Sequence, residues 1–222
     1  MTETSTTADD LRSAVTLDSP LAQLREGRLV RRLVQLYLGL VLYGVSMAFM
    51  IRANLGLDPW DVLHQGIVSR TGLSFGTIVI IVAGLVLLLW IPLRQWPGLG
   101  TVSNAIVIGL VVDQALAVLH SPSALWARIA FAVGALLMNA LATAAYVGAR
   151  LGPGPRDGLM TGLVRRTGRS VRLVRTSIEA SVLLLGWLLG GSVGFATLMY
   201  AFGIGPLTQL LLPHLTVRPR VR

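Results

Sequence analysis

Long uncharged segments, separated by short polar or arginine-containing stretches, recur along most of the chain. The first, Leu33–Ile51, has 19 residues, close to the ~20 that a helix needs to cross a hydrocarbon core. The last, Ala180–Val217, has 38 residues and must fold back once, at the glycines around position 191. The other expected spans are Thr77–Pro92, Val102–Leu119 and Ile129–Val147. The pattern therefore predicts six transmembrane helices.

Composition agrees with a membrane protein. Hydrophobic residues make up 54% of the chain, the mean hydropathy is +0.71 and 13% of residues are charged. These values disfavour a soluble domain, a disordered chain, a nucleic-acid binder and a water-filled β-barrel. Disulfides and a metal site are not expected, because the chain has no Cys and its 3 His lack metal-ligand spacing.

The distribution of basic residues predicts the orientation in the membrane. All 19 basic residues are arginine, and all but Arg52, Arg70 and Arg128 lie before the first span, at Arg94, in the run Arg150–Arg175 or after the last span. The positive-inside rule places these segments, and both termini, in the cytoplasm. Residues 1–28 are expected to form a disordered cytoplasmic tail and residues 217–222 a basic cytoplasmic tail.

The chain repeats itself with an offset of 96 residues. LGLDPWDVLHQGIVSRTGLSFG from Leu55 aligns with LGPGPRDGLMTGLVRRTGRSVR from Leu151, and 11 of these 22 positions are identical. We interpret this as two three-helix units, residues 29–120 and 121–216. Three crossings is an odd number, so the second unit enters the membrane from the opposite side. Such inverted repeats are typical of secondary transporters, whose substrate site lies between the halves.

Each half also contains a motif loop that predicts a short helix. In the first half Asp58 is the expected N-cap, Pro59 the first helical residue and Gly72 the end, which leaves about 12 residues, too few to cross a bilayer. The second loop repeats this pattern from Gly154 to Gly168. These helices either lie along the membrane surface or dip inward as re-entrant half-helices, the arrangement we favour. The expected fold is an all-α polytopic membrane protein of six transmembrane helices in a 3+3 inverted repeat, each half with one short non-spanning helix.

The motif loops supply the first candidate binding residues. Trp60 is an aromatic residue that usually anchors a protein at the membrane interface, and its counterpart in the repeat is Arg156. If both helix starts approach one cavity, the ring and the guanidinium could receive an organic anion or an amphipathic molecule. Asp61 and Asp157 are placed either to cap these helices or to contact substrate. His64 follows Asp61 by one turn and either shares a proton with it or lies on an exposed polar face.

Two polar residues inside the spans are further candidates. Asp113 lies within an uncharged segment, where a carboxylate is costly and needs a partner or water. It is either a proton-coupling or substrate-contacting group, or it reaches headgroup water near the outer boundary. Asn104 either lines a polar pathway or forms an interhelical hydrogen bond. Gln209 stands where the repeat would place a second Asp113.

Catalytic motifs are not recognisable in the sequence. It contains no Walker A motif, no HExxH and no distinguishable Ser-His-Asp set. We therefore expect neither an enzyme nor a cofactor.

Two segments resemble a known family. They are RLVQLYLGLVLYGVSMAFMIRANLGLDPWDVLHQGIVSRTGLSFGT from Arg32 and GLGTVSNAIVIGLVVDQ from Gly98. They are similar to the YczE/YyaS/YitT group of bacterial integral membrane proteins, and to its YczE-like branch in particular. The resemblance implies a multi-pass protein of the bacterial plasma membrane with poorly defined activity, some members being linked to export or production of secondary metabolites.

The combined expectation is a small-molecule permease or exporter that works by alternating access, with proton coupling through Asp113 as one option. Its partners would be the lipid bilayer and an unknown small organic molecule, without nucleic acid, and a homo-oligomer is left open. The alternative is a non-transporting membrane sensor or an assembly factor for a biosynthetic complex. In that case the run Arg150–Arg175 docks an acidic partner or anionic lipid.

Overall fold

The computed structural model describes residues 27–217, and these residues form eight α-helices. The first four are α3 (Leu29–Ala53), α4 (Pro59–Thr71), α5 (Phe75–Leu93) and α6 (Leu99–Val118). The second four are α7 (Leu125–Gly148), α8 (Pro155–Thr167), α9 (Val171–Leu188) and α10 (Phe195–Leu215). The all-helical prediction is confirmed for these residues. Most of the two predicted tails, residues 1–26 and 218–222, lies outside the described residues.

The offset found in the sequence reappears in the helix boundaries. The helices α7, α8, α9 and α10 each begin 96 residues after α3, α4, α5 and α6, respectively. The local signals recur as well. Pro59 and Pro155 occupy the first turns of α4 and α8, and both helices end at a glycine with positive φ, 70° at Gly72 and 65° at Gly168. The chain is therefore built from two copies of one four-helix pattern.

Four of the helices, α3, α6, α7 and α10, are long and apolar enough to cross a membrane. The pair α4 and α5 passes the same criterion only together, and it is bent by 115°, as in a broken span or a re-entrant loop. The 18-residue helix α9 carries Arg172, Arg175 and Glu179, so it is less apolar than the sequence pattern suggests. Of the six predicted spans, the described residues thus support four, or five if the bent pair is one span.

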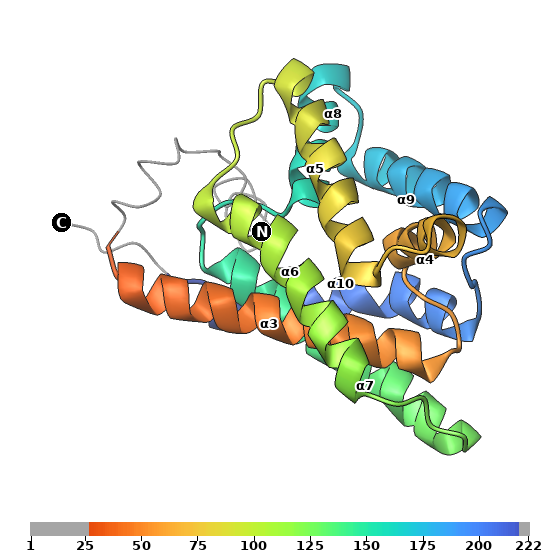
Figure 1. Ribbon diagram of the computed structural model, residues 1–222. Helices are drawn as coiled ribbons and strands as arrows, with labels where there is room; N and C mark the ends of the chain where they lie inside the picture. Colours follow the sequence, from red (N-terminus) through yellow and green to blue (C-terminus); the bar gives the residue numbers. More distant parts are fainter. Residues whose placement is uncertain (1–26, 218–222) are drawn as a thin grey trace, which may run out of the picture.

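Helices α3 and α7 are counterparts in the repeat, and they pack against each other along their length (Figure 1). Arg32, near the start of α3, donates from Nε to the carbonyl oxygen of Ala149 beyond the end of α7, over 2.8 Å. Arg128, near the start of α7, donates from Nε to the carbonyl oxygen of Ala53 at the end of α3, also over 2.8 Å. The two helices therefore run antiparallel, and each arginine satisfies carbonyl groups that the opposite helix end leaves unpaired.

A second reciprocal pair of contacts holds the loops that precede the short helices. The Gly100 amide of α6 donates to the Leu151 carbonyl over 2.6 Å, and the Ala196 amide of α10 donates to the Leu55 carbonyl over 2.9 Å. Each loop is thus bound to the first turn of a helix from the other half. This arrangement places the starts of α4 and α8 in the interior, between the two halves.

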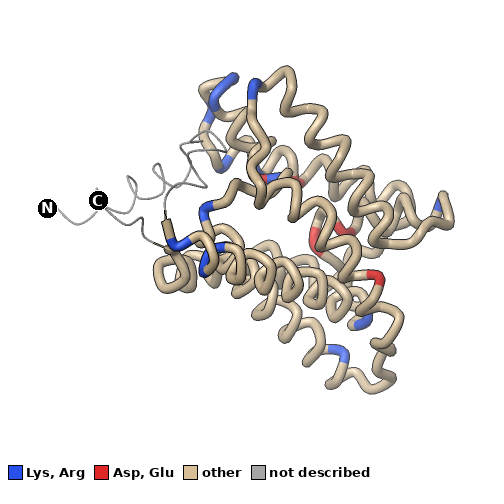
Figure 2. Tube along the Cα trace, turned by 60° about the vertical axis from the view of Figure 1, so that its left-hand side comes forward, with Lys and Arg blue, Asp and Glu red and all other residues tan. Residues whose placement is uncertain are grey.

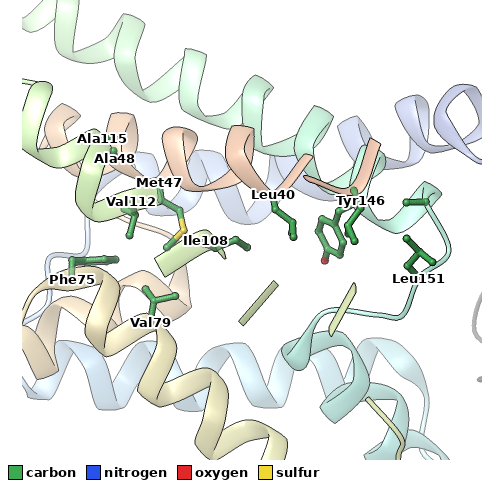
Figure 3. Packing of buried hydrophobic residues seen from close by; sticks show 12 residues of the cluster. Leu40, Met47, Ala48, Phe75, Val79, Ile108, Val112, Ala115, Tyr146 and Leu151 are labelled. Atoms are coloured by element: carbon green, nitrogen blue, oxygen red, sulfur yellow. The ribbon is translucent and has the colours of Figure 1, made fainter. Parts of the chain in front are cut away.

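The core lies where α3, α5, α6 and α7 meet (Figure 3). Its buried side chains include Leu40, Met47, Phe75, Ile108 and Val112. Outside this core, many large apolar side chains are exposed, as a helix bundle in lipid requires. Figure 2 shows arginine-containing segments gathered toward one end of the molecule, fewer at the opposite end, and the acidic positions between them.

Candidate functional site

A cavity of about 420 Å³ lies between the two halves of the protein. Both short helices contribute their first turns to its wall, and the longer helices complete it. Its charged and aromatic lining residues are Tyr43, Asp58, Trp60, His64, Tyr146, Arg150, Arg156, Asp157, Arg175, Glu179 and Tyr200. Both short helices therefore begin at one cavity, which is the condition under which Trp60 and Arg156 could contact the same ligand.

The first turn of α4 is held by Asp58, as predicted. Its Oδ1 accepts hydrogen bonds from the amides of Trp60 (2.9 Å) and Asp61 (3.1 Å), which satisfies two of the free N–H groups at the helix start. Pro59 needs no such partner because it has no amide hydrogen. The carboxylates of Asp58 and Asp61 are consequently fixed next to each other and are almost fully buried.

Arg156 reaches this cluster from the first turn of α8. Its Nη1 lies 3.8 Å from Asp58 Oδ1, and its Nη2 lies 3.8 Å from Asp61 Oδ1. The guanidinium also stacks 4.9 Å from the centroid of the Trp60 ring. Residues that are counterparts in the repeat are therefore in direct contact. Trp60 is 8% exposed, so the interpretation of this residue as a membrane-interface anchor is wrong: packing against Arg156 and α5 outweighs the preference of indole for headgroups.

His64 lies beneath the same cluster. Its Nδ1 is 3.0 Å from Asp61 Oδ1, and the ring is 1% exposed, so the expected exposed polar face is wrong. The helix-period argument could not reveal this burial, because the ring of Phe75, at the start of α5, meets the imidazole edge to face with centroids 5.8 Å apart. The alternative contact between His64 and Asp61 is confirmed as a hydrogen bond.

Asp157 is held from a different direction. Its Oδ2 accepts a hydrogen bond from the Tyr146 hydroxyl over 2.8 Å. Asp61 and Asp157 both lie in the first helical turn, as expected, yet their side chains bond to His64 and Tyr146 and not to free helix amides. Among the predicted site residues, Asn104 also lines the cavity, whereas Asp61 is buried behind its wall.

Three tyrosines in the cavity wall were not among the predicted site residues: Tyr43, Tyr146 and Tyr200. The Tyr200 hydroxyl donates to Asn139 Oδ1 over 2.9 Å, and Asn139 donates onward to the Ser46 hydroxyl over 2.9 Å. The only sequence signal was a hydroxyl-bearing ring inside an apolar span, which needs a polar partner when buried.

Of the residues that line the cavity, Arg175 of α9 and Gln209 of α10 are exposed, which places the mouth of the cavity between these two helices. The Arg175 Nε donates to Glu179 Oε1 over 2.8 Å, and this i,i+4 pair is half exposed on the α9 side. On the α10 side the wall is formed by Gly205, Thr208 and Gln209. The Thr208 hydroxyl is buried and has no hydrogen-bond partner among the described residues.

Asp113 belongs to another part of the molecule, the contact between α5 and α6. Its Oδ2 accepts from the Ser74 hydroxyl over 2.6 Å and its Oδ1 accepts from the Gly76 amide over 2.7 Å. Gly76 and Gly109 lie so close together there that a Cβ on either would overlap the carbonyl oxygen of the other. Asp113 is therefore outside the cavity wall, and it fastens the start of α5 to α6.

The corresponding contact is missing in the second half. Offset by 96 residues, Gly76 becomes Arg172 and Asp113 becomes Gln209. Helix α9 packs on α4 and α8 but has no comparable packing against α10, and a Cβ at Gly205, the counterpart of Gly109, would meet open space. The mouth of the cavity occupies this gap. We call the α5–α6 contact the closed seam and the α9–α10 gap the open seam.

The wall of the cavity is charged and aromatic. Among residues 27–217, no group of three or more His, Cys, Asp or Glu side chains is placed to hold a metal ion. The available chemistry is hydrogen bonding, ion pairing and stacking on aromatic rings.

Comparison with known proteins places the chain in a family. Residues 30–213 match DUF6198, described as a family of unknown function. The chain is 39% identical over 186 residues to an uncharacterized protein of Haemophilus influenzae, covering 84% of this chain and 85% of the relative. It is 33% identical over 190 residues to the uncharacterized membrane protein YczE of Bacillus subtilis, covering 84% and 87% of the two chains.

A third relative is the uncharacterized protein YyaS of Bacillus subtilis, with 26% identity over 181 residues, 79% of this chain and 90% of the relative. No solved structure matches the chain. The resemblance to YczE and YyaS that the motif residues indicated is thus confirmed. On the match over residues 30–213, the chain belongs to the DUF6198 family.

Proposed function

We propose that this protein is a small-molecule permease that works by alternating access, with its two halves inserted as a 3+3 inverted repeat. The observation that carries the proposal is the contrast between the two seams. One cavity lies between the halves and has its mouth at the open seam, while the equivalent contact of the other half is closed. An alternating-access transporter held in one of its two states has this arrangement.

The antiparallel packing of α3 on α7 supports the inverted insertion. These helices are counterparts in the repeat, and the Arg32 and Arg128 contacts show that each begins where the other ends. A two-fold axis perpendicular to both helices relates such a pair. If both helices cross the bilayer, that axis lies in the membrane plane, as in other inverted repeats.

The arginine distribution predicts the side of the membrane to which the cavity opens in this conformation. With Arg150 and Arg175 in the cytoplasm, as the positive-inside rule predicts, the cavity opens inward and the closed seam faces outward. The protein would lie in the bacterial plasma membrane with both termini in the cytoplasm. The inward-to-outward change would close the gap between α9 and α10 and separate α5 from α6.

In this proposal Asp113 acts at the closed seam, where it accepts hydrogen bonds between α5 and α6. Protonation would remove the negative charge that accepts bonds from Ser74 and Gly76, and a charge-assisted bond is about twice as strong as a neutral one. Proton coupling would then act on the seam and not on the substrate.

The alternative, a sensor or assembly factor, would favour a dry bundle, whereas this cavity has charged residues in its wall.

Distance measurements between spin labels test alternating access without knowledge of the substrate. Because the chain has no Cys, labels can be attached to Cys pairs at the exposed positions Thr176 and Leu210 across the open seam, and Leu73 and Gln114 across the closed seam. In proteoliposomes we expect two distance populations for each pair. A condition that raises the fraction of the longer distance in one pair should raise the fraction of the shorter distance in the other pair. A single narrow population for both pairs under all conditions would contradict the proposal.

A transport assay complements this measurement. Gly205→Phe should fill the cavity without disturbing the fold, because a Cβ there meets open space. Gly84→Phe is the matched control, since Gly84 is also unobstructed but lies on the exposed face of α5, away from the cavity. Uptake of radiolabelled benzyltrimethylammonium, benzenesulfonate and phenylalanine into proteoliposomes is compared among the three proteins. We expect movement of at least one probe that Gly205→Phe abolishes and Gly84→Phe leaves intact.

A further inference from the structure

Around Arg156, acidic side chains outnumber basic ones. Asp58 and Asp61 share the single guanidinium of Arg156, at 3.8 Å each. One positive charge therefore faces two carboxylates before any other group is considered. The buried neighbour His64 does not restore the balance near pH 7.5, where an ordinary histidine is mainly uncharged.

Asp157 adds a further carboxylate, and it forms no ion pair within residues 27–217. Its Oδ2 accepts a hydrogen bond from the Tyr146 hydroxyl, and no described arginine lies within ion-pair distance of its carboxylate. Arg175 is engaged by Glu179 at the mouth, and Arg150 follows the end of α7. A carboxylate inside a membrane-embedded cavity is costly unless a cation or water accompanies it.

The walls beside Asp157 are aromatic. Tyr43 and Tyr146 meet edge to face, with ring centroids 6.2 Å apart, and Tyr200 and Trp60 complete the aromatic lining. Aromatic faces attract cations, and the guanidinium over Trp60 is an example within this site. An ammonium group near Asp157 would gain both an ion pair and a π-face, while its apolar part would contact the aliphatic wall of α5 and α6.

We infer that the cavity binds a small organic cation, an ammonium group on an apolar body, with Asp157 as its counter-ion. This inference names a substrate class for the proposed permease and rests on that function only for its transport aspect. It differs from the organic anion suggested by the Trp60 and Arg156 positions in the sequence. The structure engages Arg156 with Asp58 and Asp61, so this guanidinium is not available as an uncompensated positive charge.

Equilibrium binding to the purified protein tests this inference. Benzyltrimethylammonium, which is permanently positive, is compared by calorimetry at about pH 7.5 with benzenesulfonate, a permanently negative molecule of similar body. We expect the cation to bind at least tenfold more tightly than the anion. Asp157→Asn should weaken cation binding at least tenfold while retaining an acceptor for Tyr146, and Asp113→Asn, which removes a carboxylate outside the cavity wall, should change it by less than about threefold.

Each outcome decides the inference. No cation binding, tighter anion binding, or unchanged cation affinity in Asp157→Asn would overturn it. If Asp157→Asn does not fold, Gly205→Phe serves instead, and cation binding that survives the filled cavity overturns the inference. Cation binding without movement into proteoliposomes leaves the inference intact and counts against the permease. Movement of benzenesulfonate alone supports the permease and overturns the inference.

Discussion

The closed seam and the open seam occupy equivalent places in the two halves, yet one is packed and the other is not. At the closed seam, two glycines bring α5 and α6 into backbone contact, and Asp113 accepts two hydrogen bonds across it. At the open seam, the counterparts of Gly76 and Asp113 are Arg172 and Gln209. Close helix packing in a membrane depends on small residues, because lipid competes equally well for large apolar side chains. The open seam thus lacks both the small residue and the carboxylate that join α5 and α6 at the closed seam.

The comparison also explains why the cavity is asymmetric although the helix pattern is not. Where Trp90 of α5 packs over Gly158 of α8, its counterpart Gly186 of α9 packs over Val62 and Leu63 of α4. The indole Nε1 of Trp90 donates to the Pro155 carbonyl over 3.0 Å. The bulky partner is on the long helix in one pair and on the short helix in the other.

The largest expected effect comes from Gly76→Ala. A methyl group at this position overlaps the Gly109 carbonyl, so the closed seam must separate, at an overpacking cost of about 1–3 kcal/mol. Alanine otherwise favours a helix over glycine, so Gly84→Ala, which has open space, should leave stability equal or higher. Thermal unfolding in detergent should show opposite signs for the two variants. Equal shifts would mean that the glycine contact does not hold the seam.

Asp113→Asn should have an intermediate effect. The amide keeps one acceptor oxygen but loses the charge that strengthens the bonds from Ser74 and Gly76, a loss of about 1 kcal/mol. Hydrogen exchange measured by mass spectrometry should accelerate in the peptide that contains the Gly76 amide. The control is Gln209→Ala at the counterpart position, where no such bond exists and exchange in that peptide should not change. Unaltered exchange in Asp113→Asn would remove this residue from the seam.

The double variant Arg172→Gly with Gln209→Asp sharpens the comparison by giving the open seam the residues of the closed one. Because Arg172 is exposed, the effect on stability should be limited to the cost of glycine in a helix, about 0.5–1 kcal/mol. The distance between labels at Thr176 and Leu210 should shift toward its shorter population. No shift would indicate that residues other than this pair keep α9 and α10 apart.

Local signals in the sequence predicted much of the fold. Asp58, Pro59 and Gly72 set the limits of α4, and the structure has the helix between these positions. The repeat predicted α8 in the same way. The number of spans was predicted less well, because every long uncharged stretch was counted as one span. Helix α9 begins with charged residues, and α5 forms a bent pair with α4, so neither meets the criterion for a span by itself.

The candidate site was predicted in part. The sequence singled out Trp60, Arg156 and Asp157, which the cavity brings together, but it gave no reason to pair Arg156 with Asp58 and Asp61. Tyr43, Tyr146 and Tyr200 were missed as site residues because a tyrosine in an apolar span has the same pattern whether it faces lipid or a cavity. Asp113 was recognised as unusual, but its partner Gly76 lies 37 residues away and carries no chemical signal.

By itself the sequence determined the limits of the two short helices and that one pattern occurs twice, since caps, prolines and glycines act over a few residues. Only the tertiary structure decided which side chains are buried together, as at Trp60 and His64, and which seam is closed. These features depend on contacts between helices distant in sequence, and a helical period shows that a face is apolar without showing what covers it. The same Gly-containing pattern therefore produced packing at Gly109 and open space at Gly205.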